Sequence, residues 1–173
     1  HKPTKGEILM SSTSQVTTFH VKETDLAWAA GIVDGEGCIG LSRISNAHWS
    51  LRVAVGNTDI RMINKLKGCF GGSVRLQNKK PGKDGFKRKP LWVWVLYGAK
   101  AESFLVSIMP YLCNKADQAE IGISSRRYLH AKRYQRNYGS QAQAEKITTL
   151  TAMATELARL KQEVPVVCNN SIH

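Results

Sequence analysis

The sequence predicts an α+β fold, in which two β-hairpins form one four-stranded antiparallel sheet with helices on one face. Two pairs of short runs, rich in β-branched and aromatic residues, are each joined by a polar stretch. Helical periodicity precedes, separates and follows these pairs. The 173 residues, 42% of them hydrophobic, suffice for one buried core. The predicted order is αββαββα, with further helices after it.

The first half of this unit is a helix, a hairpin and a second helix. Apolar residues recur at helical spacing over 24–34, after a polar residue that can cap the helix. Strand patterns over 38–44 and 49–55 follow, joined by a polar turn. The next helix, over 57–70, carries an apolar stripe and ends at a Gly-Gly pair.

The second half repeats the hairpin and ends in helices. Strands are expected over 73–78 and 91–97, separated by a turn-rich loop over 79–89 that holds six Lys or Arg. Helical patterns follow over 100–109, 115–134 and 141–163. We divide the chain into a polar, flexible lead-in (1–22), a core (23–137) and a C-terminal helical extension of the same domain (138–173).

The charge balance indicates a polyanionic partner. The chain has 25 Lys and Arg against 13 Asp and Glu, a formal net charge of +12. Nucleic acid is the first expectation and an acidic membrane surface the second. No run of about 18 apolar residues is present to span a membrane. The four cysteines are widely spaced without a C-x-x-C pair, which disfavours a zinc site or a disulfide framework. Reduced, buried thiols in an intracellular protein are predicted instead.

Two carboxylates, Asp34 and Glu36, stand at the C-terminal end of the first helix. The helix dipole and the free carbonyl groups there disfavour negative charge by roughly 0.3–1 kcal/mol for each acid. A bound cation would reverse this cost. Together with the carbonyl of Gly35, the acids form an all-oxygen environment suited to Mg²⁺ or Ca²⁺. The alternative is that both acids simply lie in solvent.

The same helix carries small residues on adjacent turns: Ala27, Ala30 and Gly31. Gly31 costs about 1 kcal/mol relative to Ala in a helix interior. Small residues let two backbones approach closely. They indicate either a tight contact with the chain's own sheet or a symmetric dimer, in which two acidic helix ends lie near the axis.

The segment 29–37, A-A-G-I-V-D-G-E-G, resembles the motif of the LAGLIDADG homing endonucleases. Three later segments agree with that family: 55–59 (V-G-N-T-D), 70–72 (F-G-G) and 109–115 (M-P-Y-L-C-N-K). The resemblance covers roughly residues 24–135. Because the chain has one such motif, it is similar to the single-motif, homodimeric branch, whose sheet is saddle-like.

The resemblance implies a role for each matching residue. Glu36 matches the acid that binds the divalent metal, assisted by the carbonyl of Gly35, and it stands where the family name has Asp. Asp34 matches the first acid, which is mainly structural but belongs to the implied metal environment. Lys115 matches a basic residue lining the active site. Asn57 matches a side chain that positions water, and Arg61 lies near a further basic position. The implied cofactor is Mg²⁺, for which Ca²⁺ or Mn²⁺ can substitute.

Strand alternation places polar side chains on the sheet face away from the helices. Such side chains can read base edges in the major groove, or they form an ordinary solvated face. The predicted set is Ser42, Asn46, His48, Ser50, Arg52, Arg75, Gln77 and Lys79, together with the apolar Ile44, which shares the parity of Ser42 and Asn46. The loop after the third strand adds phosphate-binding candidates: Lys80, Lys83, Lys87, Arg88 and Lys89. A basic helix adds Arg126, Arg127, Lys132, Arg133 and Arg136, with a solvated charge run as the alternative.

Trp92 and Trp94 have two interpretations. By alternation from Val93 and Val95 they lie on the DNA side, or a bulge reverses the parity and places them in the core.

The leading functional hypothesis is a site-specific endonuclease that hydrolyses both strands of a long pseudo-palindromic DNA as a homodimer, with no small-molecule cofactor. The chemistry fits: phosphodiester hydrolysis needs a metal to neutralise the phosphate and a cation to stabilise the transition state. The alternative is an intron RNA maturase or a non-cleaving DNA-binding regulator with the same fold. A membrane-surface protein is disfavoured, because no amphipathic helix has a Trp- or Phe-rich face.

Overall fold

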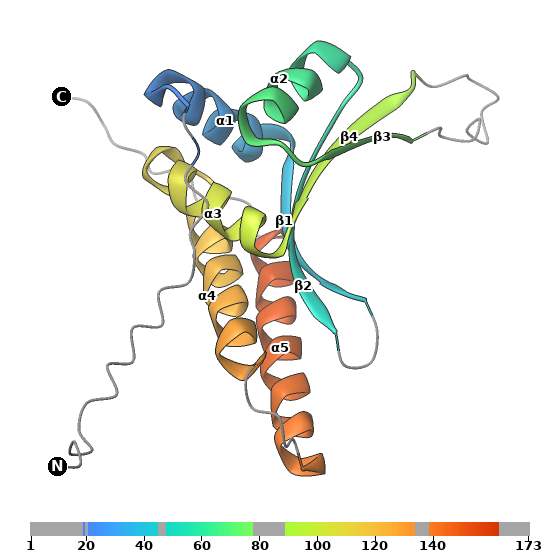
Figure 1. Cartoon of the computed structure of the whole chain (residues 1–173), viewed down its shortest axis with the longest axis vertical. Helices are drawn as coiled ribbons and strands as arrows, with labels where there is room; N and C mark the ends of the chain where they lie inside the picture. The colour runs from blue at the N-terminus through green and yellow to red at the C-terminus, as the bar shows by residue number, and fades with distance from the viewer. Residues whose placement is uncertain (1–18, 20, 45–47, 78–88, 134–138, 163–173) are drawn as a thin grey trace, which may run out of the picture.

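The computed structural model describes residues 19, 21–44, 48–77, 89–133 and 139–162. The predicted αββαββα order is confirmed, and the helices lie on one side of the sheet (Figure 1). The elements are α1 (Glu23–Glu36), β1 (Gly37–Arg43), β2 (Trp49–Asn57), α2 (Ile60–Phe70), β3 (Ser73–Gln77), β4 (Leu91–Tyr97), α3 (Gly98–Ile108), a 3₁₀ turn (Met109–Tyr111), α4 (Ala116–Arg133) and α5 (Ser140–Leu160).

The four strands form one antiparallel sheet in the order β1-β2-β4-β3. The two hairpins diverge from the centre of the molecule, the β1–β2 turn pointing down and the β3–β4 hairpin to the upper right, so the sheet is strongly twisted (Figure 1). The register pairs Ile39 with Val53 and Val53 with Leu96, which puts these three side chains on the same face.

The core lies between that face and helices α1 to α4. Ile39, Val53 and Leu96 pack there against buried residues of the helices, among them Val33, Phe104 and Ile123. The opposite face of the sheet has a smaller apolar centre, formed by Ala54, Val93 and Val95.

Trp92 and Trp94 lie on the core side of the sheet, so of their two interpretations the DNA contact is wrong. The Trp94 side chain is fully buried, its ring meets Phe104 edge-on at 5.2 Å, and its Nε1–H donates to the Gly71 carbonyl at 2.7 Å. Trp92 shares its parity and packs half-buried against the same core. Both tryptophans face the helices because Trp94 pairs with the inward-facing Val55, and no bulge is needed. Val93 and Val95 therefore take the outer face.

Two glycines allow abrupt changes of element. Helix α1 runs directly into β1 at Gly37, where a Cβ would lie 2.5 Å from the Val33 carbonyl oxygen. Any side chain at that position would force the helix end apart. Gly98 has φ of 59°, a left-handed conformation that lets α3 start immediately after β4, two residues earlier than its pattern predicts.

Helix α5 packs beside α4 and reaches the edge strand β1 with its C-terminal end (Figure 1). Just after this end, Lys161 lies near Gly40, and its Nζ approaches the Cys38 Sγ at 3.6 Å. Cys38 and Cys113 are exposed, so the prediction of buried thiols is wrong at both positions. Among the described helices, none combines the length and apolar character needed to cross a bilayer.

Candidate active site at the end of the first helix

Asp34 joins the end of α1 to the start of α4. Its carboxylate accepts three backbone N–H groups: Cys113 at 2.8 Å, Asn114 at 3.1 Å and Lys115 at 2.9 Å. These are unpaired donors at the N-terminus of α4, where the helix dipole also favours negative charge. Asp34 is therefore unfavourably placed on α1 but caps the N-terminus of α4. Both carboxylate oxygens of Asp34 are thus engaged in joining the two helices.

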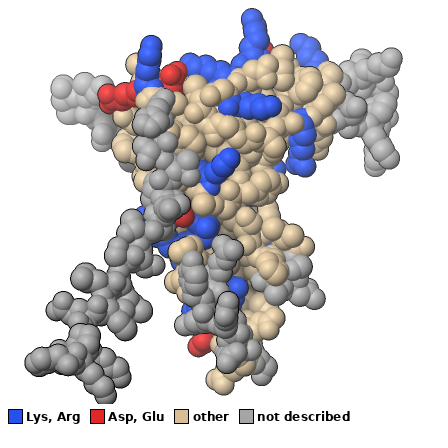
Figure 2. All heavy atoms as spheres, viewed as in Figure 1, with Lys and Arg blue, Asp and Glu red and all other residues tan. Residues whose placement is uncertain are grey.

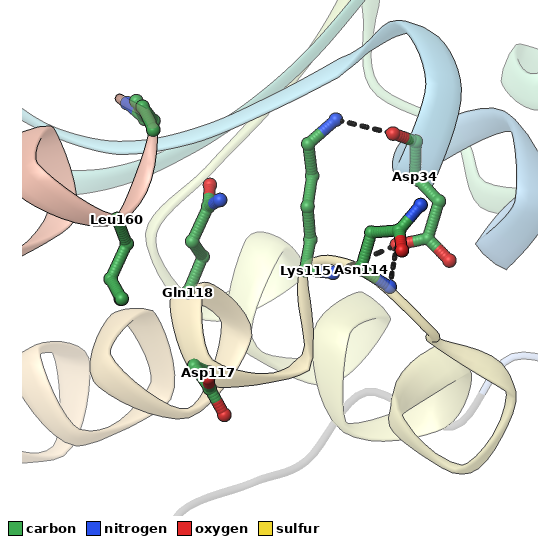
Figure 3. Close-up of a pocket in the computed structure, with 7 residues that line it drawn as sticks. Asp34, Asn114, Lys115, Asp117, Gln118 and Leu160 are labelled. Carbon is green, nitrogen blue, oxygen red and sulfur yellow. Dashed lines mark hydrogen bonds between the residues drawn. The ribbon is translucent and has the colours of Figure 1, made fainter. Parts of the chain in front are cut away.

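Lys115, just before α4, forms hydrogen bonds back to the C-terminal end of α1. Its Nζ donates to the carbonyl oxygens of Val33 at 2.8 Å and of Asp34 at 2.7 Å, as Figure 3 shows for the second of these. The ammonium thus supplies a positive charge at the end of α1, where the dipole favours a cation. Burial lowers the pKa of Lys115 below its ordinary 10.5, while the nearby charges of Asp34 and Glu36 oppose that shift.

Glu36 is the acid whose carboxylate the fold leaves available. It is the last residue of α1 and is exposed, and no hydrogen bond or ion pair engages it within the part of the chain that the structure describes. The preceding residue, Gly35, is also exposed. Within the described ranges, no three His, Cys, Asp or Glu side chains come close enough to hold a metal ion. One chain therefore brings a single unengaged carboxylate to this helix end.

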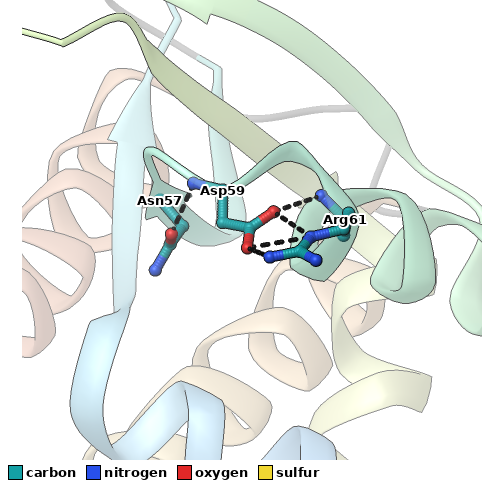
Figure 4. Close-up of polar contacts among 3 residues, drawn as sticks. All are labelled: Asn57, Asp59 and Arg61. Atoms are coloured by element: carbon teal, nitrogen blue, oxygen red, sulfur yellow. Dashed lines mark hydrogen bonds and ion pairs between the residues drawn. The ribbon is translucent and has the colours of Figure 1, made fainter.

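Asn57 and Arg61 lie beyond the same end of the sheet, where β2 leads into α2. Asn57 Oδ1 accepts from the Asp59 N–H at 2.7 Å, which leaves its amide nitrogen pointing away from that contact (Figure 4). Asp59 caps α2 and holds the Arg61 guanidinium, with Nη2 2.6 Å from Oδ2. The hydrogen bonds from Arg61 lower the pKa of Asp59 to about 2, so this pair is fully ionised at neutral pH.

Residues from three elements line a pocket of about 410 Å³ beside Lys115 (Figure 3). Asp34 comes from α1, Gln118 from α4, and Leu160 and Lys161 from the end of α5. The charge of Lys161 lowers the pKa of Lys115 further. Sequence reasoning missed Gln118 and Lys161. Gln118 is three residues after Lys115, so the helical repeat could have placed the two side chains together, whereas Lys161 has no such signal.

The small residues of α1 divide between two faces. Ala30 is fully buried in the chain's own core with Ala29 and Val33, so its prediction as a dimer contact is wrong. Ala27 and Gly31 are exposed, one helical turn apart. A Cβ added at Gly31 would meet nothing within 4 Å. The chain's own packing therefore does not require glycine at this position.

The outer sheet face carries most of the described polar residues predicted to read DNA. Register places Ser42 opposite Ser50, and Arg52 opposite Tyr97, with Arg75 and Gln77 on the neighbouring strand. Tyr97, 47% exposed, is a further member that sequence reasoning missed, although alternation from Val95 points to it. Ile44 and His48, at the hairpin end, are exposed.

Lys89, just before β4, is also exposed. Several other predicted contacts lie outside the described residues: Asn46, Lys79, Lys80, Lys83, Lys87, Arg88, Arg136 and the side chain of Arg133. In the predicted basic helix, Arg127 forms an ion pair with the buried Glu102, with Nε 3.4 Å from Oε1.

On the face of the molecule that Figure 2 shows, basic side chains gather over the upper part, where α2 lies, and acidic ones lie at the upper left, over α1. Arg61, Lys65 and Lys67 of α2 are exposed there. Lys65 is partly neutralised by Asp25, 2.9 Å away. Such clustering makes the local electrostatic potential more positive, which attracts a polyanion.

Comparison with known proteins places this fold. No family model matches the chain. A curated relative, DNA endonuclease I-CvuI of Chlorella vulgaris, is 31% identical over 118 residues, 62% of this chain. The match spans 66% of that relative's length, just under two thirds.

Solved structures of homing endonucleases share the fold. The homing endonuclease I-CvuI with a DNA target matches with a TM-score of 0.60 and 20% identity, covering 83% of this chain and 85% of that one. The archaeal intron-encoded I-Vdi141I with DNA gives 0.60 and 14%, covering 82% and 86%. The LAGLIDADG homing endonuclease I-GzeII with its DNA target gives 0.56 and 12%, covering 75% of this chain but 43% of that one. The chain has the LAGLIDADG homing endonuclease fold.

Proposed function

We propose that this chain is a LAGLIDADG homing endonuclease, a site-specific DNA endonuclease that cuts both strands of its target as a homodimer. The observation that carries the proposal is the unengaged Glu36 carboxylate at the end of α1, beside the Asp34–Lys115 pair that fixes this end in place. The names of the relative and of the structural neighbours support it, since these are endonucleases and several were crystallised with DNA.

The donor set at this end fits a hard divalent cation. The Glu36 carboxylate and the Gly35 carbonyl would hold Mg²⁺, because oxygen ligands suit Mg²⁺ or Ca²⁺ and no thiolate or imidazole is needed. I-CvuI has been crystallised with DNA in the presence of Mg and of Ca. When bound, such an ion neutralises charge on the phosphate and activates water.

Lys115, Asn57 and Arg61 would stabilise the developing charge and orient water. Two N–H groups of the Lys115 ammonium are held by the end of α1, so its positive charge is fixed close to Glu36, where it would stabilise charge developing on a phosphate oxygen. The amide nitrogen of Asn57, whose oxygen is engaged by the Asp59 N–H, is available to orient water. Arg61 would contribute a second cation, held ready by Asp59.

A homodimer accounts for what one chain lacks. A single chain brings one unengaged carboxylate to this end, and cutting two strands needs two such acids. Gly31 and Gly35 face open space one helical turn apart, with Ala27 a turn before them. Close packing of α1 against its copy would explain the glycines and bring the two Glu36 residues near a common axis. The chain also covers most of I-CvuI but less than half of the longer I-GzeII.

The outer sheet face would bind the DNA. Arg52, Arg75 and Gln77 can hydrogen-bond to base edges in the major groove, and Ser42 and Ser50 add shorter polar contacts. Exposed lysines such as Lys89 would bind phosphates, giving affinity without sequence information.

The experiment is selection of cleaved sites from a randomised DNA library, followed by cleavage of the selected site with and without Mg²⁺. We expect a double-strand cut by the wild type only with the metal, and none by Glu36→Gln, which keeps the shape of the side chain without its charge. Both proteins are expected to bind the site equally in electrophoretic shift assays. Binding without any metal-dependent cut by the wild type would instead indicate a DNA-binding regulator.

A further inference from the structure

Gln118 is a buried polar residue whose acceptor has no partner among the described residues. Its side chain is 6% exposed, and Oε1 is buried without a hydrogen bond. An unpaired buried acceptor costs about 1–3 kcal/mol, so such groups are almost always satisfied, often by ordered water. A buried apolar side chain of the same size would avoid this cost, so the presence of Gln here calls for a reason.

Gln118 and Lys115 lie on the same face of the start of α4. The Ala119 N–H donates to the Lys115 carbonyl at 2.9 Å, so Lys115 already belongs to the first turn of the helix. Residues three apart then project together. In Figure 3 both side chains rise from this end of α4 in the same direction. Both line the pocket, as does Lys161, which follows the last residue of α5.

The chemistry of the two side chains is complementary. The Lys115 ammonium uses two of its three N–H groups on the end of α1, and Gln118 Oε1 needs a donor. No direct hydrogen bond joins them in the described part of the chain. The pocket, about 410 Å³, is large and polar enough for an ordered water with several protein partners.

We propose that Gln118 is a positioning residue of the cleavage site, which holds the Lys115 ammonium through an ordered water in this pocket. The water accepts a hydrogen bond from the third Lys115 N–H and donates one to Gln118 Oε1. Gln118 does not touch the DNA, and it acts only by fixing where the ammonium lies. The inference rests on the proposed function, since cleavage is one of its two measurements.

The first measurement compares single-turnover cleavage, DNA affinity and thermal stability for Gln118→Met, Gln118→Glu and the wild type. Met keeps the size but removes the acceptor, and we expect cleavage to slow about tenfold with unchanged affinity, the loss of one positioning hydrogen bond. Glu keeps an acceptor oxygen and is expected to cleave faster than Met. The matched control is Gln143→Met on the exposed face of α5, with an unchanged rate.

Cleavage by Gln118→Met within twofold of the wild type would overturn the proposal, as would equal losses in the Met and Glu variants. The second measurement is a high-resolution crystal structure of the wild type. It should show a water within about 3 Å of both Lys115 Nζ and Gln118 Oε1, and a structure without that water would also overturn the proposal. If the wild type cuts no DNA, the proposed endonuclease function fails, while the crystal structure still decides the water.

Discussion

Replacing Asp34 by Asn is expected to destabilise the fold, whereas replacing Glu36 by Gln is expected to leave it unchanged. Asp34 accepts three backbone N–H groups at 2.8–3.1 Å, one on Oδ2 and two on Oδ1. An Asn at this position keeps one acceptor oxygen, and its NH₂ group then faces an N–H that needs an acceptor. Glu36 makes no such contact in the described structure.

The size of the effect follows from the hydrogen bonds that Asn cannot accept. A hydrogen bond to a charged group contributes about 1.5–3 kcal/mol, and the favourable charge at the N-terminus of α4 adds about 0.3–1 kcal/mol. Because the site is partly exposed, we take the lower part of the combined range and expect Asp34→Asn to lower the free energy of unfolding by about 2 kcal/mol. For the exposed Glu36, a change within about 0.5 kcal/mol is expected.

The assay is urea denaturation followed by circular dichroism, without divalent metal and at one fixed protein concentration, since dimerisation would make stability depend on concentration. Equal stability of Asp34→Asn and the wild type would refute the capping role of Asp34. Equal destabilisation of both variants would show that Glu36 has a structural contact, and its assignment to the metal would lose its basis.

Three further perturbations test the dimer interface, the burial of Trp94 and the electrostatics of Lys115. Gly31→Ala is expected to weaken dimerisation in sedimentation experiments, although Ala favours the helix over Gly by about 1 kcal/mol. The control Gly68→Ala, at another helical glycine with open space around it, should leave dimerisation unchanged. Equal dimerisation of the two variants would contradict the placement of α1 in the interface. Trp94→Phe loses the hydrogen bond to Gly71 and leaves a cavity, so urea denaturation should show a loss of about 2–3 kcal/mol, and an unchanged stability would contradict the buried placement. The pKa of Lys115 lies below 10.5 in the folded protein, so between the lowered value and 10.5 the unfolded chain binds more protons than the folded one. The free energy of unfolding should therefore rise with pH in that window, as urea denaturation at several pH values would measure. The rise should be absent from Lys115→Met.

Strand and helix order could be read from the sequence because hydrophobic periodicity and Gly stops act locally. The sequence does not show which face of β4 is buried, because the side chains on both of its faces are apolar. Val93 and Val95 would fill a core as well as Trp92 and Trp94 do. The choice is made by the pairing of Trp94 with Val55, which is a contact between residues 39 positions apart in the sequence.

The site was predicted as a set of residues, but its arrangement depends on distant contacts. The sequence alone indicates that Asp34 is unfavourably placed at the C-terminal end of α1. The ammonium of Lys115 lies at this helix end, and the N–H groups around Asp34 come from residues that precede α4. Lys161 enters from the end of α5, and no local pattern marks it.

The contribution of one Glu36 carboxylate to each DNA strand can be tested by cleavage of the selected site, carried on a supercoiled plasmid, by mixed dimers of the wild type and Glu36→Gln. If each chain brings one acid and cuts one strand, the wild type linearises the plasmid in Mg²⁺, the variant alone leaves it supercoiled, and the mixed dimer produces a nicked circle. Linear product from the variant alone, or from a purified mixed dimer, would contradict the assignment of one essential Glu36 to each strand.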